Sequence, residues 1–193
     1  AYLLFIGGWP SVVIGLASIL AALADTTGPY PLAYIGIADL FVMIFFGFVA
    51  VLGTEYVVSG SISSAGWGYG AAIGGLIVNI LVVNNIRDID TDRAAGRVNI
   101  PVSFGRNAAE IEYLLMLILA FGLPITLVLL RLAPWPVLLA WATLPTAWRL
   151  WREIRGGLAG PPLNRVLGQT AQLVFRYALL TALGYGLALL FLN

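Results

Sequence analysis

The chain has 193 residues, of which 61% are hydrophobic and only 10% are charged, and its formal net charge is +1. It contains neither cysteine nor histidine, which excludes disulfides, thiolate and imidazole metal ligands, and every Ser-His-Asp arrangement. Any metal ion must therefore be bound by oxygen, and the lack of a basic patch outside short loops argues against nucleic acid as a partner.

The apolar residues gather in runs of about twenty, the length of a helix that crosses the hydrocarbon core of a bilayer. No run alternates in the way that the strands of a membrane barrel do. We therefore predict an all-α fold, a polytopic transmembrane helical bundle that forms one domain over residues 1–193. Its six predicted spans cover approximately residues 2–24, 38–58, 67–83, 108–130, 136–151 and 170–192.

The third predicted span contains Gly70, Gly74 and Gly75. Small residues at this spacing allow a neighbouring helix to approach closely, which is one way in which membrane helices associate. We interpret these glycines as packing residues rather than as part of a binding site.

The distribution of arginine predicts the orientation of the bundle, because the chain contains no lysine. Two spans separate the two arginine-rich loops, so both should lie on the same side of the membrane. Short loops rich in basic residues stay in the cytoplasm, and we expect a multi-pass protein of the inner cell membrane with these loops cytoplasmic. The loops contain Arg87, Arg93, Arg97 and Arg106, and Arg149, Arg152, Arg155 and Arg165.

The segment from Asn84 to Arg97, NNIRDIDTDRAAGR, contains three aspartates and three arginines of the chain's 9 acidic and 10 basic residues. Asp88 and Asp92 are four residues apart, so on a continuing helix they point to the same side. Their mutual repulsion favours a cation beside them, and Mg²⁺ typically takes one or two carboxylates together with substrate phosphates. We expect Asp90 to be solvated.

Other polar residues of the segment suit a phosphate-bearing ligand. Arg87 and Arg93 flank the aspartates, and a guanidinium group matches phosphate or carboxylate oxygens. Asn84 and Asn85 offer uncharged amide groups. A solvated helix end whose charges pair with one another remains the alternative, whereas a calcium loop is excluded because the required glycine and closing glutamate are missing.

The segment resembles the second aspartate-rich motif of the UbiA superfamily of intramembrane prenyltransferases, with its Asn, Arg-Asp and second Asp-Arg followed by glycine and a basic residue. GPYPLAYIGIADLFVMIFFGFVAVLGTEYV, from Gly28 to Val57, is similar to the matching segment of members that act in menaquinone synthesis. The likeness extends over most of the chain.

The resemblance implies a magnesium-dependent transfer of a polyprenyl group from polyprenyl diphosphate to dihydroxynaphthoate, with loss of carboxylate and diphosphate, giving demethylmenaquinone. It implies that Asp88 and Asp92 are catalytic and hold Mg²⁺ on the diphosphate. The other residues that it implicates, as substrate-binding, are Asn84, Asn85, Arg87, Arg93, Arg97 and Asp39.

Two features depart from the family pattern. The first aspartate-rich motif of the family, of the form NDxxDxxxD, does not occur in this sequence, and the six spans match the last six of about nine. We therefore expect an amino-terminal portion of three spans to precede this chain. Family members also carry Lys-x-Thr after the glycine, where this chain has Arg97, Val98 and Asn99.

Three alternative functions remain open at this point. The chain resembles a family that includes other aromatic prenyltransferases with different acceptors. A small transporter would also place polar residues in its spans, but the sequence contains no convincing internal repeat. A non-catalytic membrane subunit is compatible with the missing first motif.

Overall fold

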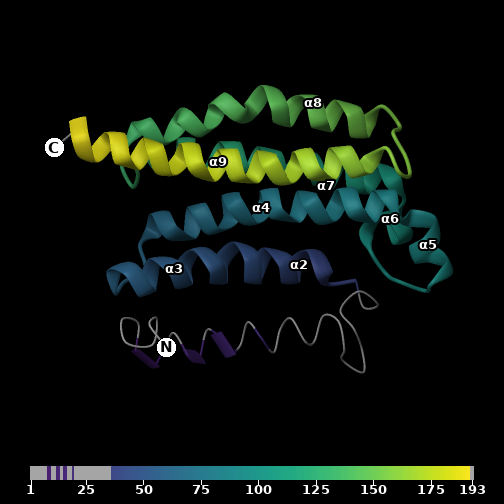
Figure 1. Cartoon of the computed structure of the whole chain (residues 1–193), viewed down its shortest axis with the longest axis horizontal. Helices are drawn as coiled ribbons and strands as arrows, with labels where there is room; N and C mark the ends of the chain where they lie inside the picture. Colours follow the sequence, from purple (N-terminus) through teal and green to yellow (C-terminus); the bar gives the residue numbers. More distant parts are fainter. Residues whose placement is uncertain (1–7, 10–11, 14, 17–18, 20–35, 192–193) are drawn as a thin grey trace.

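The computed structural model describes residues 8–9, 12–13, 15–16, 19 and 36–191. Throughout residues 36–191 the regular elements are helices, and they form an elongated bundle (Figure 1). The first predicted span, at about residues 2–24, falls largely outside the described residues. The all-α fold predicted from the sequence is confirmed for the described part of the chain.

In residues 36–191 the bundle is built from four long helical segments, a fifth segment formed by a 3₁₀-helix and the α-helix after it, and two short helices. The first long segment joins α2 (Ala38–Val42), the π-helix η2 (Met43–Val49) and α3 (Ala50–Ser59), and Gly60, with φ 75°, ends it. Helix α4 (Ser64–Arg87) follows, and the Ser63 hydroxyl caps its start by accepting from the Gly66 N–H at 3.0 Å. The remaining elements are α5 (Ile89–Ala94), α6 (Ile100–Phe104), α7 (Arg106–Leu129), the 3₁₀-helix η3 (Trp135–Thr143), α8 (Leu144–Arg155) and α9 (Leu163–Phe191).

Four helices in the described residues are long and apolar enough to cross a membrane: Ala38–Ser59, Ser64–Arg87, Arg106–Leu129 and Leu163–Phe191. The predicted span at 136–151 instead divides into η3 and α8. Helix α9 also begins seven residues before the predicted residue 170, at Leu163. The count of six spans is therefore not confirmed, although the chain is a multi-pass membrane protein.

Helix α4 lies at the centre and packs against η2, α7 and α9 (Figure 1). Glycines on both helices permit the contact between α4 and η2. A Cβ atom on Gly47 of η2 would lie 2.7 Å from the carbonyl oxygen of Gly70 and 2.8 Å from the Cα of Gly74, both in α4. On the α7 side, a Cβ on Gly75 would lie 3.3 Å from the Met116 carbonyl oxygen. The packing role predicted for these glycines is confirmed.

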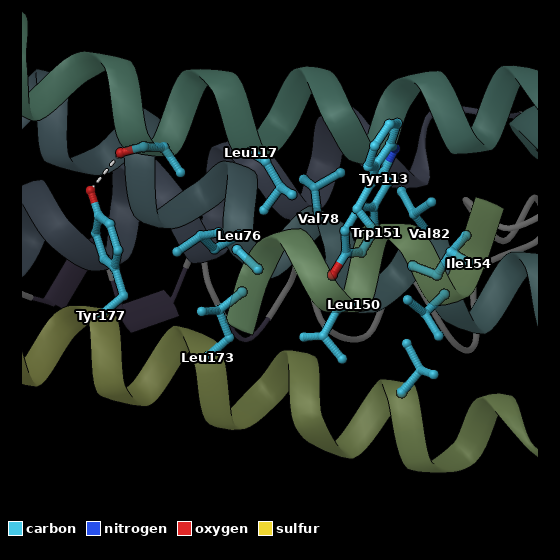
Figure 2. Packing of buried hydrophobic residues seen from close by; sticks show 14 of the residues in the cluster. Leu76, Val78, Val82, Tyr113, Leu117, Leu150, Trp151, Ile154, Leu173 and Tyr177 are labelled. Carbon is cyan, nitrogen blue, oxygen red and sulfur yellow. Dashed lines mark hydrogen bonds between the residues drawn. The ribbon is translucent and has the colours of Figure 1, made fainter. Parts of the chain in front are cut away.

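The core lies between α4, α7, α8 and α9, and two fully buried tyrosines anchor it (Figure 2). The Tyr177 hydroxyl donates to the Ala120 carbonyl oxygen at 2.6 Å, and the Tyr113 hydroxyl lies 3.2 Å from the Thr170 Oγ1. Each phenol therefore keeps a hydrogen-bonding partner inside an apolar core, where an unpaired hydroxyl would cost about 1–3 kcal/mol.

The two arginine-rich loops lie at the same end of the bundle. Arg87, at the end of α4, donates to the Asn164 side-chain oxygen at 2.7 Å, near the start of α9. Arg106, at the start of α7, donates to the carbonyl oxygens of Ile154 at 2.6 Å and Leu158 at 2.8 Å. These contacts join the start of α7 to the end of α8 and to the turn that follows it.

Candidate functional site

The charged segment begins where α4 ends. Asp88 leaves the helical conformation, with φ −103° and ψ 14°, and α5 starts at the next residue. Backbone hydrogen bonds from Asp88 to Asn84 at 3.1 Å and from Asp92 to Asp88 at 2.8 Å continue across this break. The segment is therefore an ordered continuation of a buried helix rather than an open loop.

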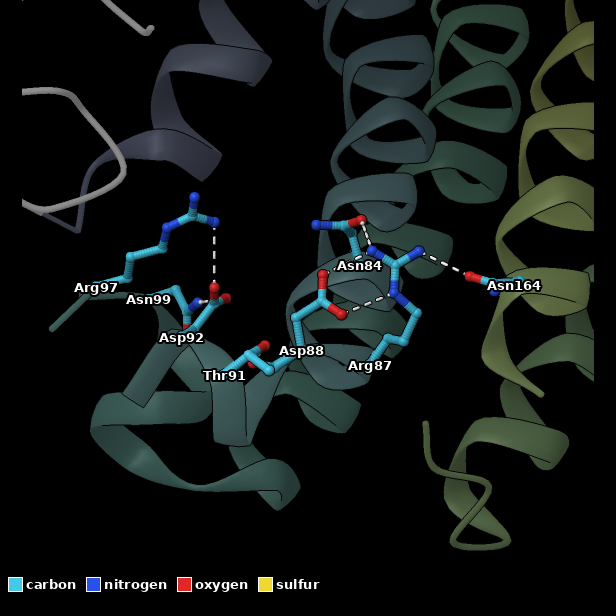
Figure 3. A network of polar contacts seen from close by, with 8 residues as sticks. All are labelled: Asn84, Arg87, Asp88, Thr91, Asp92, Arg97, Asn99 and Asn164. Atoms are coloured by element: carbon cyan, nitrogen blue, oxygen red, sulfur yellow. Dashed lines mark hydrogen bonds and ion pairs between the residues drawn. The ribbon is translucent and has the colours of Figure 1, made fainter. Parts of the chain in front are cut away.

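Arg87 forms hydrogen bonds with several polar side chains around the end of α4 (Figure 3). Its Nε and Nη2 donate to the two carboxylate oxygens of Asp88 at 2.8 and 2.6 Å, which is a bidentate ion pair. The same guanidinium group donates to the side-chain oxygens of Asn84 and Asn164, both at 2.7 Å. Four hydrogen bonds thus fix its orientation.

This ion pair changes the titration of Asp88, which lies outside the membrane-spanning segments. The hydrogen bonds from Arg87 hold the pKa of the Asp88 carboxyl below its ordinary value of 3.8. An aspartate whose pKa is lowered by folding adds stability above its unfolded-state pKa and loses that stability as the pH falls through the lowered value.

We therefore expect Asp88→Asn to lower the free energy of unfolding by about 1 kcal/mol at neutral pH. The difference from the wild type should shrink as the pH falls from the unfolded-state pKa of aspartate, about 4, through the lowered pKa of Asp88 in the folded protein. Thermal unfolding in detergent at several pH values measures both effects. Asp90→Asn is the matched control, because the Asp90 side chain is 98% exposed. A difference in unfolding free energy between Asp88→Asn and the wild type that stays constant with pH would contradict the prediction.

Asp92 is held by a second, separate set of partners (Figure 3). Its side chain is only 7% exposed, and its Oδ1 lies 3.1 Å from the Arg97 Nη1. Its Oδ2 accepts from the Asn99 Nδ2 at 2.9 Å. The Asn99 Oδ1 in turn accepts from the Val102 N–H at 2.9 Å and caps α6, so the start of α6 orients the amide that binds Asp92.

Asp88 and Asp92 are thus each compensated by an arginine. The sequence predicts that both carboxylates share one side of a continuing helix, whereas the structure ends α4 between Asn84 and Asp92 and gives each carboxylate its own partners. Among the described residues, no group of three or more acidic side chains could hold a metal ion.

A cavity of about 150 Å³ lies beside Asp92 between the start of α2 and the end of α4. Four predicted site residues border it, namely Asn84, Asn85, Asp92 and Arg97. Its other walls are apolar side chains from α2 and α4 together with the Val98–Asn99 turn. The cavity therefore has a charged, amide-bearing side and an apolar side. Its lining residues are Ala38, Val42, Leu81, Asn84, Asn85, Asp92, Arg97, Val98 and Asn99.

The other predicted residues lie at or beyond the edge of this cavity. Asp39 lies between two lining residues of α2, and its Oδ1 is buried without a hydrogen-bond partner in the part of the chain that the structure describes. Arg93 pairs with the exposed Asp90 at 3.6 Å and does not border the cavity. The solvated position expected for Asp90 is confirmed.

The sequence reasoning missed Asn99 and Asn164. Asn99 had a local signal, because an asparagine followed by Ile-Pro suits the cap of a helix with proline in its first turn. Asn164 lies 77 residues from Arg87 in the sequence, and no pattern connects the two.

The oxygen atoms at this site suit Mg²⁺. Asp88 and Asp92 supply carboxylate oxygens and Asn84 an amide oxygen, which are the hard ligands that this ion prefers. Each of these four carboxylate oxygens accepts a hydrogen bond from an arginine or asparagine side chain, and a carboxylate oxygen has a second lone pair to offer. Two carboxylates with water and substrate phosphate form a common magnesium environment.

The described residues thus form a multi-pass helical bundle with carboxylates, guanidinium groups and amides around a cavity at one end. The chain belongs to the UbiA prenyltransferase family, whose model matches residues 1–162. No solved structure matches the chain.

The curated relatives carry related names. The chain is 36% identical over 177 residues to 1,4-dihydroxy-2-naphthoate octaprenyltransferase of Mycobacterium tuberculosis (strain ATCC 25618 / H37Rv), covering 91% of this chain and 60% of that protein. It is 36% identical over 94 residues to the Escherichia coli (strain K12) protein of the same name, covering 49% and 30%. It is 31% identical over 154 residues to the UbiA prenyltransferase domain-containing protein 1 homolog of Drosophila melanogaster, covering 80% and 42%. This chain therefore spans at most 60% of the length of these three relatives.

Proposed function

We propose that this protein transfers a polyprenyl group from polyprenyl diphosphate to dihydroxynaphthoate. The reaction releases diphosphate and carboxylate and gives demethylmenaquinone. The observation that carries this proposal is the cavity that joins Asp92, Arg97 and three asparagines to apolar side chains at one end of a membrane bundle. The names of the relatives support the same acceptor.

The two ends of the donor substrate require different surroundings. Its isoprenoid chain is apolar and favours the bundle and the bilayer, whereas its diphosphate needs cationic and hydrogen-bonding groups. Arg97 borders the cavity, and its guanidinium group binds the diphosphate and stabilises the charge that develops when the carbon–oxygen bond breaks. Asn84 and Asn85 supply amide groups to the same anion.

Arg87 and Asp88 position the metal-binding end of the site. The bidentate pair fixes the Asp88 carboxylate, and Asp92 is fixed by Asn99. In this proposal Asp88 and Asp92 hold Mg²⁺, which when bound neutralises diphosphate charge and makes it a better leaving group. Arg93, on the exposed side of α5, is suited to attract anionic substrates to the entrance, and Asp39 lies on the α2 wall.

We also propose that the arginine-rich end of the bundle faces the cytoplasm of the inner membrane. The arginines at this end include Arg87, Arg106 and Arg165, and the opposite end has Arg131 in the α7–η3 turn. This asymmetry is the one that the positive-inside rule associates with cytoplasmic loops. Water-soluble acceptor and diphosphate would then enter and leave on the cytoplasmic side.

A product assay with the full-length protein tests the proposal. With a polyprenyl diphosphate, dihydroxynaphthoate and Mg²⁺, we expect the prenylated, decarboxylated product in the mass spectrum. Omitting Mg²⁺ or adding a chelator should abolish its formation. Equal or faster transfer to 4-hydroxybenzoate would contradict the proposed acceptor and favour another aromatic prenyltransferase of the family.

A further inference from the structure

The outer face of α8 carries charges that the candidate site does not use. Helix α8 runs along the edge of the bundle beside α9 (Figure 1). Ala147, Leu150 and Ile154 are fully buried on its inner side. Trp148, half of whose surface is exposed, lies on the other side with the exposed Arg149, Arg152 and Arg155.

One end of this face lies level with the start of a candidate membrane span. Arg106, the first residue of the membrane-crossing helix α7, binds the carbonyl oxygen of Ile154 at 2.6 Å, so the end of α8 lies level with the start of that span. From Arg155 back to Arg149 a helix rises about 9 Å. The arginines therefore cover the zone where long basic side chains reach towards phosphates and where tryptophan rings favour the interface.

Two of these arginines have no carboxylate partner. In residues 36–191, Arg149 and Arg152 make no ion pair, because the adjacent Glu153 pairs with Arg165 at 2.8 Å. The Arg155 guanidinium group lies 5.2 Å from the Trp151 ring centre, and the Trp148 and Trp151 rings are 4.7 Å apart. The guanidinium groups of Arg149 and Arg152, which make no ion pair in residues 36–191, thus belong to the same helix face as the paired rings of Trp148 and Trp151.

Two hollows, of about 570 and 510 Å³, lie on this face and share Trp148 and Arg152. Pro145, Arg149 and Glu153 complete the first. Trp151, Arg155 and Gly156 complete the second. Arg152 can therefore direct its guanidinium group to a ligand in either hollow.

We propose that the outer face of α8 binds the phosphate group of an anionic phospholipid such as phosphatidylglycerol. The guanidinium groups of Arg149 and Arg152 match the geometry of phosphate oxygens, and Trp148 packs against the glycerol backbone and the upper acyl chain. A zwitterionic lipid carries an ammonium group next to its phosphate, which the neighbouring arginines repel. Charge complementarity thus selects the anionic lipid over phosphatidylcholine.

Native mass spectrometry of the delipidated, full-length protein tests this site. We expect phosphatidylglycerol to bind about tenfold more tightly than phosphatidylcholine with the same acyl chains. Arg152→Gln should remove most of that preference, and Arg149→Gln, which faces the first hollow alone, should reduce it less. Arg131→Gln is the matched control, because Arg131 is exposed at the opposite end of α7.

The outcomes separate the lipid from other ligands. Equal affinities for the two lipids, or an unchanged preference in both α8 variants, would overturn the proposal. Displacement of phosphatidylglycerol by millimolar inorganic phosphate would assign the face to free phosphate and overturn it as well. Unchanged thermal unfolding midpoints for the variants establish that lost lipid preference does not come from lost folding.

Discussion

Asp92→Asn should lower prenyl transfer by about a thousandfold or more while the bundle stays folded. The substitution removes the negative charge that, in the proposed mechanism, binds Mg²⁺ beside the diphosphate. The amide of the variant keeps only one acceptor oxygen, so it can no longer accept from both the Arg97 Nη1 and the Asn99 Nδ2. The measurement is the initial rate of product formation by the full-length protein at saturating substrates.

Asp90→Asn is the control for this experiment. Asp90 lies two residues away and its variant loses the same charge, but the Asp90 side chain is 98% exposed and lies 3.6 Å from Arg93. Its activity should stay within about twofold of the wild type, since exposed pairs contribute little. Turnover of Asp92→Asn within tenfold of the wild type would contradict the role assigned to this carboxylate.

Gly47→Leu should strongly destabilise the described bundle. A Cβ atom at this position meets only backbone, 2.7 Å from the Gly70 carbonyl oxygen and 2.8 Å from the Gly74 Cα, so no side chain can move aside. The two helices must separate, and we expect a loss of about 3 kcal/mol or more in the free energy of unfolding. Thermal unfolding in detergent measures the loss.

Gly122→Leu on α7 makes the same chemical change in another membrane-crossing helix. A Cβ at Gly122 has no other group within 4 Å, so this variant should unfold close to the wild-type temperature. Both variants add the same hydrophobicity, and only the available space differs. Similar unfolding temperatures for the two would show that the close approach of η2 to α4 does not limit stability.

The helical fold was predictable because the bilayer leaves few choices. Apolar runs of about twenty residues must satisfy their backbone groups internally, and glycines at small-residue spacing mark where helices meet. The fifth predicted span shows the limit of this reasoning. Its apolar residues are helical, but Pro134 and Pro136 begin a 3₁₀ segment, and the arginines from Arg149 onward shorten the apolar part of α8.

The candidate site was predictable in composition but not in arrangement. The density of charge in an apolar chain identified the segment, and Asn84, Asn85, Asp92 and Arg97 do meet around one cavity. The sequence could not show that Arg87 pairs with its neighbour Asp88, because side-chain geometry at a helix end decides this. The contact of Arg87 with Asn164 depends on the packing of α9 against α4, which no local pattern encodes.

The most direct test of the account is whether Asp88 and Asp92 hold a divalent cation together with diphosphate. Mn²⁺ can replace Mg²⁺ and be followed by electron paramagnetic resonance in the full-length protein, with a non-reactive analogue of polyprenyl diphosphate. We predict that the analogue tightens Mn²⁺ binding at least about tenfold, and that Asp88→Asn combined with Asp92→Asn abolishes this gain. The same gain in the double variant would contradict the account.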